Sequence, residues 1–294
     1  GEWLHHFGYE VELLPVDRYG QVSPDTVHAR LRPDTWLVSV MHANNEIGTV
    51  QPVEAIGQLC KEREVWFHVD AVQTFGLLPV TVDTLACDLL SLSSHKVYGP
   101  KGVGALYIRA GTPLQPLLVG GGQEHDRRAG TEHVAGIVGF AEAARIAEQL
   151  RESECLRLTQ QRNTFIQKVL NAVPETHLTG HPTERLPNNV HFRFVGVPSD
   201  SLLIALDRCR RQQRRSVQCR LAGTLACANG TRLGRDRRPR RGALLLRTPH
   251  HRRGYRLHGR DAGVNRSPNP STPEKAIDPL RMFVKEGPWS RPSL

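Results

Sequence analysis

The sequence lacks any long hydrophobic run. None of its apolar segments approaches the ~20 residues that a membrane-spanning helix needs, so no membrane association is expected. Its first residues, GEWLHHFGYE, contain neither an initiating Met nor a signal-peptide pattern. Its six cysteines are scattered, without the spacing of a metal site or a disulfide framework. These absences predict a reduced, cytoplasmic protein without a bound metal, and a chain that begins inside a longer reading frame.

One segment has no lysine and almost no negative charge. Residues 208–260 hold 17 Arg and a single acidic residue, Asp236. The whole chain has 39 basic and 29 acidic residues, whereas the part outside this segment has 22 basic and 28 acidic residues. The net charge of +10 therefore arises in this one segment. The remainder is mildly acidic, which argues against a nucleic-acid partner for the protein as a whole. An arginine-rich arm that binds nucleic acid through its phosphates is the alternative for this segment.

From Tyr9 to about Asp207, short β-type runs alternate with helical stretches. YEVELLPV, TWLVSVMH, VWFHVDA, CDLLSLSS and VGALYIR are typical of strands, whereas VEAIGQLCKERE is typical of an amphipathic helix and residues 132–173 of a long helix. This alternation predicts an α/β fold whose mostly parallel sheet is covered by helices on both faces. Ligands in such sheets bind at the carboxyl ends of the strands.

The alternation stops after Asp207. The following residues show no sustained helical or strand period, and the tail from Asn265 is rich in Pro and Ser, as disordered segments are. Arginine without lysine over this length, together with the sudden loss of pattern, favours a reading frame that has slipped. A natural arginine-rich arm is the alternative interpretation.

Polar side chains follow three of the predicted strands at the point where each strand ends. They are Asn44, Asn45 and Glu46 after the first, Asp70 and Gln73 at the second, and Ser93, Ser94, His95 and Lys96 after the third. Lys96 follows a run typical of a buried strand, and a buried ammonium is costly unless its pKa falls or the amine is covalently bound.

This collection of groups suits pyridoxal phosphate. A lysine amine forms a Schiff base with the cofactor's aldehyde, which removes the cost of burying its charge. A carboxylate beside the pyridine nitrogen keeps that nitrogen protonated, so that the ring can accept electrons from a substrate carbanion. Hydroxyl groups and main-chain N–H groups bind the phosphate.

Four stretches carry a specific resemblance: MHANNEIGTVQP, HVDAVQ, SSHKVYGPKGVGALYIR and GGGQEHDRRAGT. They resemble the cysteine desulfurase branch of the class V aminotransferase-like, fold-type I pyridoxal-phosphate enzymes. The resemblance extends from the first residues to about Asp207. It implies a cofactor-binding large domain over residues 1–150 that lacks its N-terminal part, the start of a small α+β domain over 151–207, and an aberrant, disordered tail over 208–294.

The resemblance also implies roles for individual residues. Lys96 would form the Schiff base and act with His95 in catalysis, while Asp70 would pair with the pyridine nitrogen. Gln73 would bind the phenolic oxygen of the ring, and Ser93 together with His95 would bind the phosphate.

Two further roles lie at the edge of the cofactor site. Asn45 would lie near the substrate carboxylate and a cofactor oxygen, and Thr131 would reach the phosphate of the other subunit in a homodimer. The family reaction takes sulfur from L-cysteine, leaves L-alanine, and passes the sulfur through an enzyme persulfide to an iron–sulfur scaffold, a thiolated tRNA or another acceptor protein.

The resemblance has two gaps. The family's N-terminal portion, with a phosphate-binding Gly/Thr turn and a histidine that stacks on the ring, has no counterpart here. The loop of the type Ser-Ser-Gly-Ser-Ala-Cys, which carries the nucleophile, is absent after LLIALD, and Cys209, Cys219 and Cys227 do not stand in such a motif. Another class V enzyme, such as an aminotransferase or a selenocysteine lyase, therefore stays open as an alternative.

Overall fold

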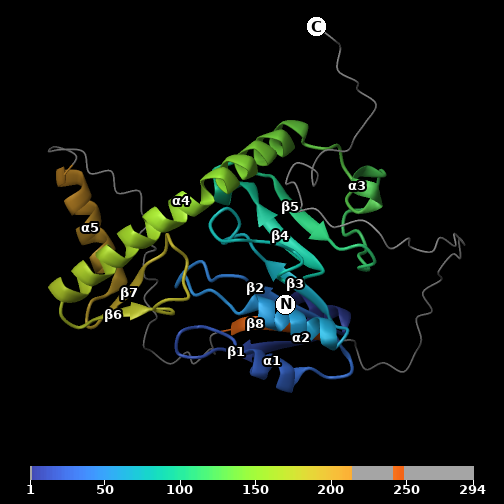
Figure 1. Ribbon diagram of the computed structural model, residues 1–294, viewed down its shortest axis with the longest axis horizontal. Helices are drawn as coiled ribbons and strands as arrows, with labels where there is room; N and C mark the ends of the chain where they lie inside the picture. The colour runs from blue at the N-terminus through green and yellow to red at the C-terminus, as the bar shows by residue number, and fades with distance from the viewer. Residues whose placement is uncertain (1, 214–240, 248–294) are drawn as a thin grey trace, which may run out of the picture.

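A six-stranded sheet forms the larger part of the computed structural model, which describes residues 2–213 and 241–247 (Figure 1). Its strands are β1 (Glu10–Pro15), β2 (Thr35–Met41), β3 (Trp66–Asp70), β4 (Leu89–Ser93), β5 (Gly104–Ile108) and β8 (Arg241–Arg247). Their order across the sheet is β1-β8-β2-β3-β4-β5. Strands β2, β3 and β4 are parallel, β5 is antiparallel to β4, and β8 is antiparallel to both of its neighbours.

The remaining elements are mostly helical. They are η1 (Glu2–Phe7), α1 (Pro24–Arg30), α2 (Val53–Glu62), η2 (Ser94–Val97), the short α3 (Gln123–Asp126), α4 (Val134–Ala172) and α5 (Ser199–Gln213), with a second sheet of β6 (Thr176–Thr179) and β7 (His191–Phe194). Helix α4 leads away from the large sheet toward β6, β7 and α5 (Figure 1). Within the described ranges, no helix is both long enough and apolar enough to cross a membrane.

The hydrophobic core lies against one face of the large sheet. Alternate residues of β2, β3 and β4 are buried there, namely Val38, Val40, Phe67, Val69, Leu90 and Leu92. They pack with Val27 of α1, Ile56 of α2 and Phe140 of α4. Helix α2 is amphipathic because its buried Val53, Ile56 and Cys60 recur at helical spacing. This face is the one that carries α1 and α2 in front of the strands in Figure 1.

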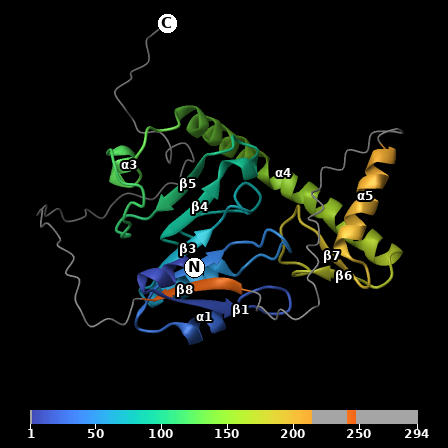
Figure 2. The same cartoon turned by 180° about the vertical axis from the view of Figure 1, so that it is seen from behind.

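The opposite face of β2, β3 and β4 is only half-buried and mixes polar with apolar residues. Its alternate positions hold Leu37, Ser39, Met41, Trp66, His68, Asp70, Leu89, Ser91 and Ser93. Figure 2, from behind, shows β8 and β1 in front of α1. The α/β class expected from the sequence, a sheet flanked by helices, is confirmed.

Strand β8 corrects the expectation that residues 208–294 lack regular structure. Helix α5 continues to Gln213, and residues 241–247 form a strand between β1 and β2. The sequence RGALLLR supplies a short apolar run, and two neighbouring strand edges give its main-chain groups hydrogen-bonding partners. The expected disorder from Asn265 onward lies outside the described residues.

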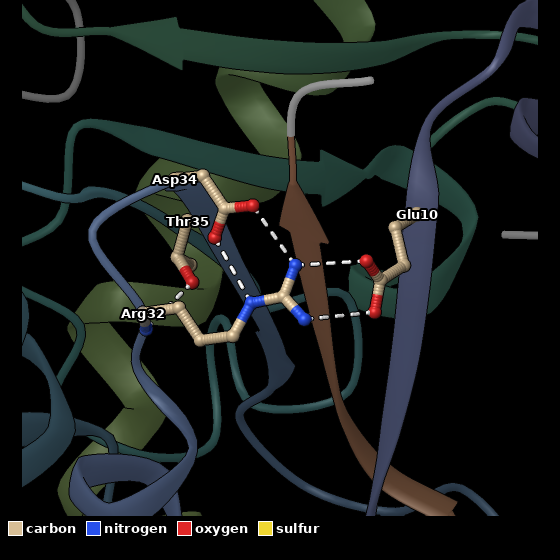
Figure 3. A network of polar contacts seen from close by, with 4 residues as sticks. All are labelled: Glu10, Arg32, Asp34 and Thr35. Carbon is tan, nitrogen blue, oxygen red and sulfur yellow. Dashed lines mark hydrogen bonds and ion pairs between the residues drawn. The ribbon is translucent and has the colours of Figure 1, made fainter. Parts of the chain in front are cut away.

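Arg32 joins the strands on either side of β8 (Figure 3). Its guanidinium donates hydrogen bonds to the carboxylate of Glu10 on β1, with Nη2–Oε2 at 2.8 Å, and to that of Asp34 just before β2, with Nη2–Oδ2 at 2.9 Å. Glu10 and Thr35 both stand opposite Arg247 in the sheet. The ion pairs therefore span the carboxyl end of β8.

Candidate active site

The three parallel strands end at one edge of the sheet, where the sequence predicts the site. Met41 at the end of β2 stands opposite Asp70 at the end of β3, and Asp70 stands opposite Ser91 on β4. The chain that leaves these strands carries Asn45 after β2, Gln73 after β3, and η2 after β4. Adjacent parallel strands thus deliver the polar residues of three separate motifs to the same edge.

Lys96 lies in the 3-10 turn η2, directly after β4. The turn buries Ser94 and Val97 while the side chain of Lys96 is exposed. Tyr98 ends the turn in the left-handed region, with φ of 64°, and Gly99 lies so close to the Ser94 hydroxyl and Ala143 of α4 that a side chain would collide with them. The premise that Lys96 is a buried ammonium is therefore wrong in this structure, because the strand ends at Ser93 and the lysine follows in the turn as an exposed residue.

Ser93 and His95 form a polar pair beside Lys96. The hydroxyl of Ser93 lies 2.8 Å from Nδ1 of His95, and the pair is exposed. A hydroxyl and an imidazole can both donate hydrogen bonds to phosphate oxygens. The pair can therefore receive an anionic group next to the lysine.

Asp70 shares its strand and its face of the sheet with a histidine that the sequence motifs did not single out. The Oδ1 atom of Asp70 accepts a hydrogen bond of 3.0 Å from the main-chain N–H of Val72. His68, two residues earlier and on the same face, lies between Ser39 Oγ at 2.7 Å from Nδ1 and Ser91 Oγ at 2.8 Å from Nε2. Burial lowers the pKa of His68, against an opposing effect of Asp70. The imidazole is therefore neutral near pH 7.

The turn that holds Gln73 is joined to the end of β2 by another histidine, His42, which is buried. His42 Nδ1 lies 2.9 Å from the hydroxyl of Thr74, and the same hydroxyl donates to the carbonyl of Ala71 at 3.2 Å. His42 also donates its main-chain N–H to the carbonyl of Asp70 at 2.8 Å. Gln73 itself is half-buried.

Asn45 and Thr131 are both exposed. Asn45 belongs to the tight loop after β2, in which Oδ1 of Asn44 accepts hydrogen bonds from the main-chain N–H groups of Glu46 and Ile47 at 2.9 and 3.0 Å. Thr131 lies between α3 and α4 rather than at the strand ends. Its expected role, at the site of another subunit, stays a prediction.

Two of the described cysteines, Cys60 and Cys87, are poorly suited to act as a nucleophile. Burial raises the pKa of Cys60 to about 12 and that of Cys87 to about 11, so both remain thiols near pH 7. Cys155 is half-buried on α4. The side chains of Cys209, Cys219 and Cys227 lie outside the described part of the chain. Among the residues that are described, no group of His, Cys, Asp and Glu is arranged to hold a metal ion.

The groups at the strand ends fit pyridoxal phosphate. The exposed amine can react with the aldehyde. The half-buried carboxylate, which among the described residues has no cation beside it on the same face of the sheet, can pair with the pyridine nitrogen. The hydroxyl–imidazole pair can bind the phosphate. Lys96, Asp70, Ser93 and His95 come from neighbouring parallel strands and the turn that follows them. Nothing in this donor set conflicts with the cofactor.

Sequence reasoning missed four buried or half-buried polar residues around the site. They are His42, His68, Arg185 and Asn189. His68 could have been found because it stands two positions before Asp70 on the same strand, and alternate residues share a face. His42 is the residue just before ANNE, but its buried position depends on how β2 packs. Arg185 and Asn189 gave no local signal.

Comparison with known proteins supports the same assignment. A family model for the class V aminotransferases matches residues 3–212. Cysteine desulfurase IscS of Dictyoglomus turgidum is 51% identical over 205 residues, covering 70% of this chain and 52% of that protein. Cysteine desulfurase IscS of Methanosarcina thermophila is also 51% identical over 205 residues, covering 70% of this chain and 50% of its own length. The chain thus spans about half the length of the curated relatives it matches.

Solved structures show the same architecture. A NifS-like protein superimposes with a TM-score of 0.68 at 35% identity, covering 84% of this chain and 65% of the other. DndA from Streptomyces lividans gives a TM-score of 0.65 at 31% identity, covering 84% of this chain and 70% of its own. The fold is that of the fold-type I enzymes, and class V members depend on pyridoxal phosphate. By sequence and by fold, the chain belongs to the aminotransferase class V family.

Proposed function

We propose that the protein is a pyridoxal-phosphate-dependent cysteine desulfurase. The observation that carries the proposal is an exposed lysine turn at the carboxyl ends of three parallel strands, in a chain that is 51% identical to proteins named cysteine desulfurase IscS. These relatives give no support to another class V activity or to nucleic-acid binding as the main function.

The chain's own residues would divide the work of holding the cofactor. Bound pyridoxal phosphate supplies an aldehyde that condenses with amines and a ring that stores the negative charge released at a substrate carbon. Nζ of Lys96 would hold the aldehyde, and the carboxylate of Asp70 would keep a proton on the pyridine nitrogen. Ser93 and His95 would donate hydrogen bonds to the phosphate, and Gln73 would bind the phenolic oxygen.

In the proposed reaction, L-cysteine and an acceptor thiol give L-alanine and a persulfide. Asn45 would orient the substrate by its carboxylate. The buried thiols of Cys60 and Cys87 are not suited to the attack on sulfur because their pKa values are raised by burial. The acceptor beyond the persulfide would be a sulfur-carrying or iron–sulfur scaffold protein.

We also propose a cytoplasmic homodimer in which Thr131 of one subunit reaches the phosphate at the other. Tyr98, which ends the lysine turn, is 99% exposed, and Leu117 and Val119 are further exposed apolar side chains, which supports an interface. In the proposed division, residues 1–150 bind the cofactor and 151–207 begin the small domain, with α4 passing from one to the other.

The proposal is tested first by cofactor binding. The purified chain with pyridoxal phosphate should develop a visible absorption band that Lys96→Ala abolishes. Lys101→Ala, an exposed lysine in the same motif, is the matched control and should keep the band. Alanine and sulfide released from L-cysteine under reducing conditions would then establish desulfuration. Absence of the band in the unaltered chain, or an equal band in Lys96→Ala, would refute the proposal.

A further inference from the structure

The loop that presents Asn45 is held from outside by a segment far away in the sequence. Four successive carbonyl groups, those of residues 45–48, each accept a hydrogen bond from residues 185–189. Asn189 Nδ2 donates to the carbonyls of Asn45 at 3.3 Å and Glu46 at 3.1 Å. The carbonyls of exposed loops usually bond to water, so four consecutive protein donors indicate a dedicated support.

The carbonyls of the other two loop residues, Ile47 and Gly48, also accept hydrogen bonds directly from protein donors. Arg185 Nη2 donates to the carbonyl of Ile47 at 2.8 Å, and the main-chain N–H of Leu186 donates to that of Gly48 at 2.8 Å. A β-bridge joins Thr49 to Arg185, and Val50 donates its N–H to the carbonyl of Glu184 at 2.9 Å. The loop is therefore bound along its whole length.

Close packing leaves the loop little room to shift. A Cβ on Gly48, whose φ is +76°, would come within 2.5 Å of Oδ1 of Asn189. A Cβ on Gly180, whose φ is +83°, would collide with the carbonyl of Ile47. Both glycines are needed where the two segments approach, because each has a left-handed backbone and no space for a side chain.

The supporting segment is itself fixed to the long helix. Arg162 of α4 donates through Nη1 to the carbonyls of Arg185 at 3.1 Å and Leu186 at 2.9 Å. Arg162 and Arg185 are 9% and 4% exposed, and no carboxylate in the described part of the chain pairs with either. Burying two guanidinium groups on carbonyl oxygens alone is costly, which argues for a positional role.

We propose that Asn189 and Arg185 are positioning residues, which hold the loop of residues 44–49 so that the side chain of Asn45 is oriented for the carboxylate of an amino-acid substrate. The inference rests on the proposed function for the identity of the ligand. The support of the loop itself is independent of it. Asn189 acts through the main chain of Asn45 and Glu46 and does not need to touch the substrate.

Hydrogen exchange tests the support of the loop without any cofactor. Asn189→Ala should speed exchange of the main-chain amides of residues 44–50 while leaving those of β3 and β4 as protected as before. Asn188→Ala is the matched control, since Asn188 is the exposed neighbour in the same turn. Equal exchange of residues 44–50 in the two variants would overturn the proposal. If Asn189→Ala loses protection over the whole sheet, the smaller change Asn189→Ser is compared with Asn188→Ala by the same criterion.

Ligand binding tests the consequence for the site. L-alanine titrated into the cofactor-loaded chain should perturb the visible band, with an affinity that Asn189→Ala weakens at least about fivefold, the effect of one net hydrogen bond. Asn45→Ala should weaken it similarly, and the affinity for pyridoxal phosphate should change less than the affinity for L-alanine. Faster loop exchange with an unchanged L-alanine affinity would overturn the role of Asn189 in orienting Asn45. Absence of a band in the unaltered chain would instead refute the proposed function and leave the exchange result to decide the support of the loop.

Discussion

His42 and Thr74 are joined by a buried hydrogen bond, with 2.9 Å between Nδ1 and the hydroxyl oxygen. The bond ties the end of β2 to the turn after β3, the turn that carries Gln73. Burial lowers the pKa of His42 to about 4. The imidazole is therefore neutral near pH 7, when it can share this hydrogen bond, and charging it would place an unpaired cation in the core.

Replacing His42 with Asn should remove a source of acid sensitivity. Between pH 6.5 and 4 the unfolded chain binds a proton at this histidine that the folded chain does not, so stability falls as the pH falls through this window. From pH 7 to pH 5 the loss from His42 should be about 2 kcal/mol. Urea denaturation at both pH values should show a smaller drop for His42→Asn than for the unaltered chain. An equal drop in the two proteins would contradict the buried neutral histidine.

A proline in β8 should destabilise the large sheet. Leu245 stands opposite Glu12 of β1 and Val38 of β2, so Leu245→Pro removes an N–H from a strand with neighbours on both sides. We expect a loss of about 3 kcal/mol or more, by analogy with proline in a helix interior. Leu245→Val keeps the N–H and is the control. Thermal unfolding at the same temperature for both variants would show that β8 does not pair in solution.

Gly57→Ala should strain the contact between α2 and the chain before β4. A Cβ at this buried position would collide with the carbonyl of Leu85, a main-chain atom that cannot rotate away. Overpacking of this kind costs about 1–3 kcal/mol, despite the better helix propensity of alanine. Gln58→Ala, on the exposed side of the same helix, should change stability by less than about 0.5 kcal/mol. Chemical denaturation of both variants measures the difference, and equal stabilities would contradict the close packing.

Cys60 and Cys87 should resist alkylation in the folded protein. Both thiols are buried, and their raised pKa values leave almost no thiolate at pH 8. Mass spectrometry after treatment with N-ethylmaleimide should find them modified only when the chain is unfolded in denaturant. Rapid modification of either in the native protein would contradict the burial of these thiols.

The parts of the candidate site that depend on short sequence patterns could be predicted. The alternation of apolar residues in β2, β3 and β4 indicated strands, and the polar residues after them indicated the binding edge. Burial could not be predicted in the same way. Lys96 was expected inside and is exposed, because β4 ends at Ser93 and a turn of η2 carries the lysine outward.

Contacts between distant segments escaped prediction altogether. His68 bonds to serines on two neighbouring strands, and Asn189 supports a loop more than 140 residues earlier. Neither relationship has a period or a motif, since each depends on which strands become neighbours and which loops meet. The strand β8 was missed because its few apolar residues stand among arginines, and its pairing depends on the open edges of β1 and β2.

The sequence by itself determined the α/β class and the groups offered to the cofactor, because these follow from the pattern of residue types along short stretches. The resemblance of four such stretches to known enzymes indicated the family. The tertiary structure alone decided which of those groups are exposed, which histidines stay neutral, and what holds the loop of Asn45 in place. Those properties depend on desolvation and on hydrogen bonds between segments far apart in the chain, and both arise only when the strands and loops have packed together.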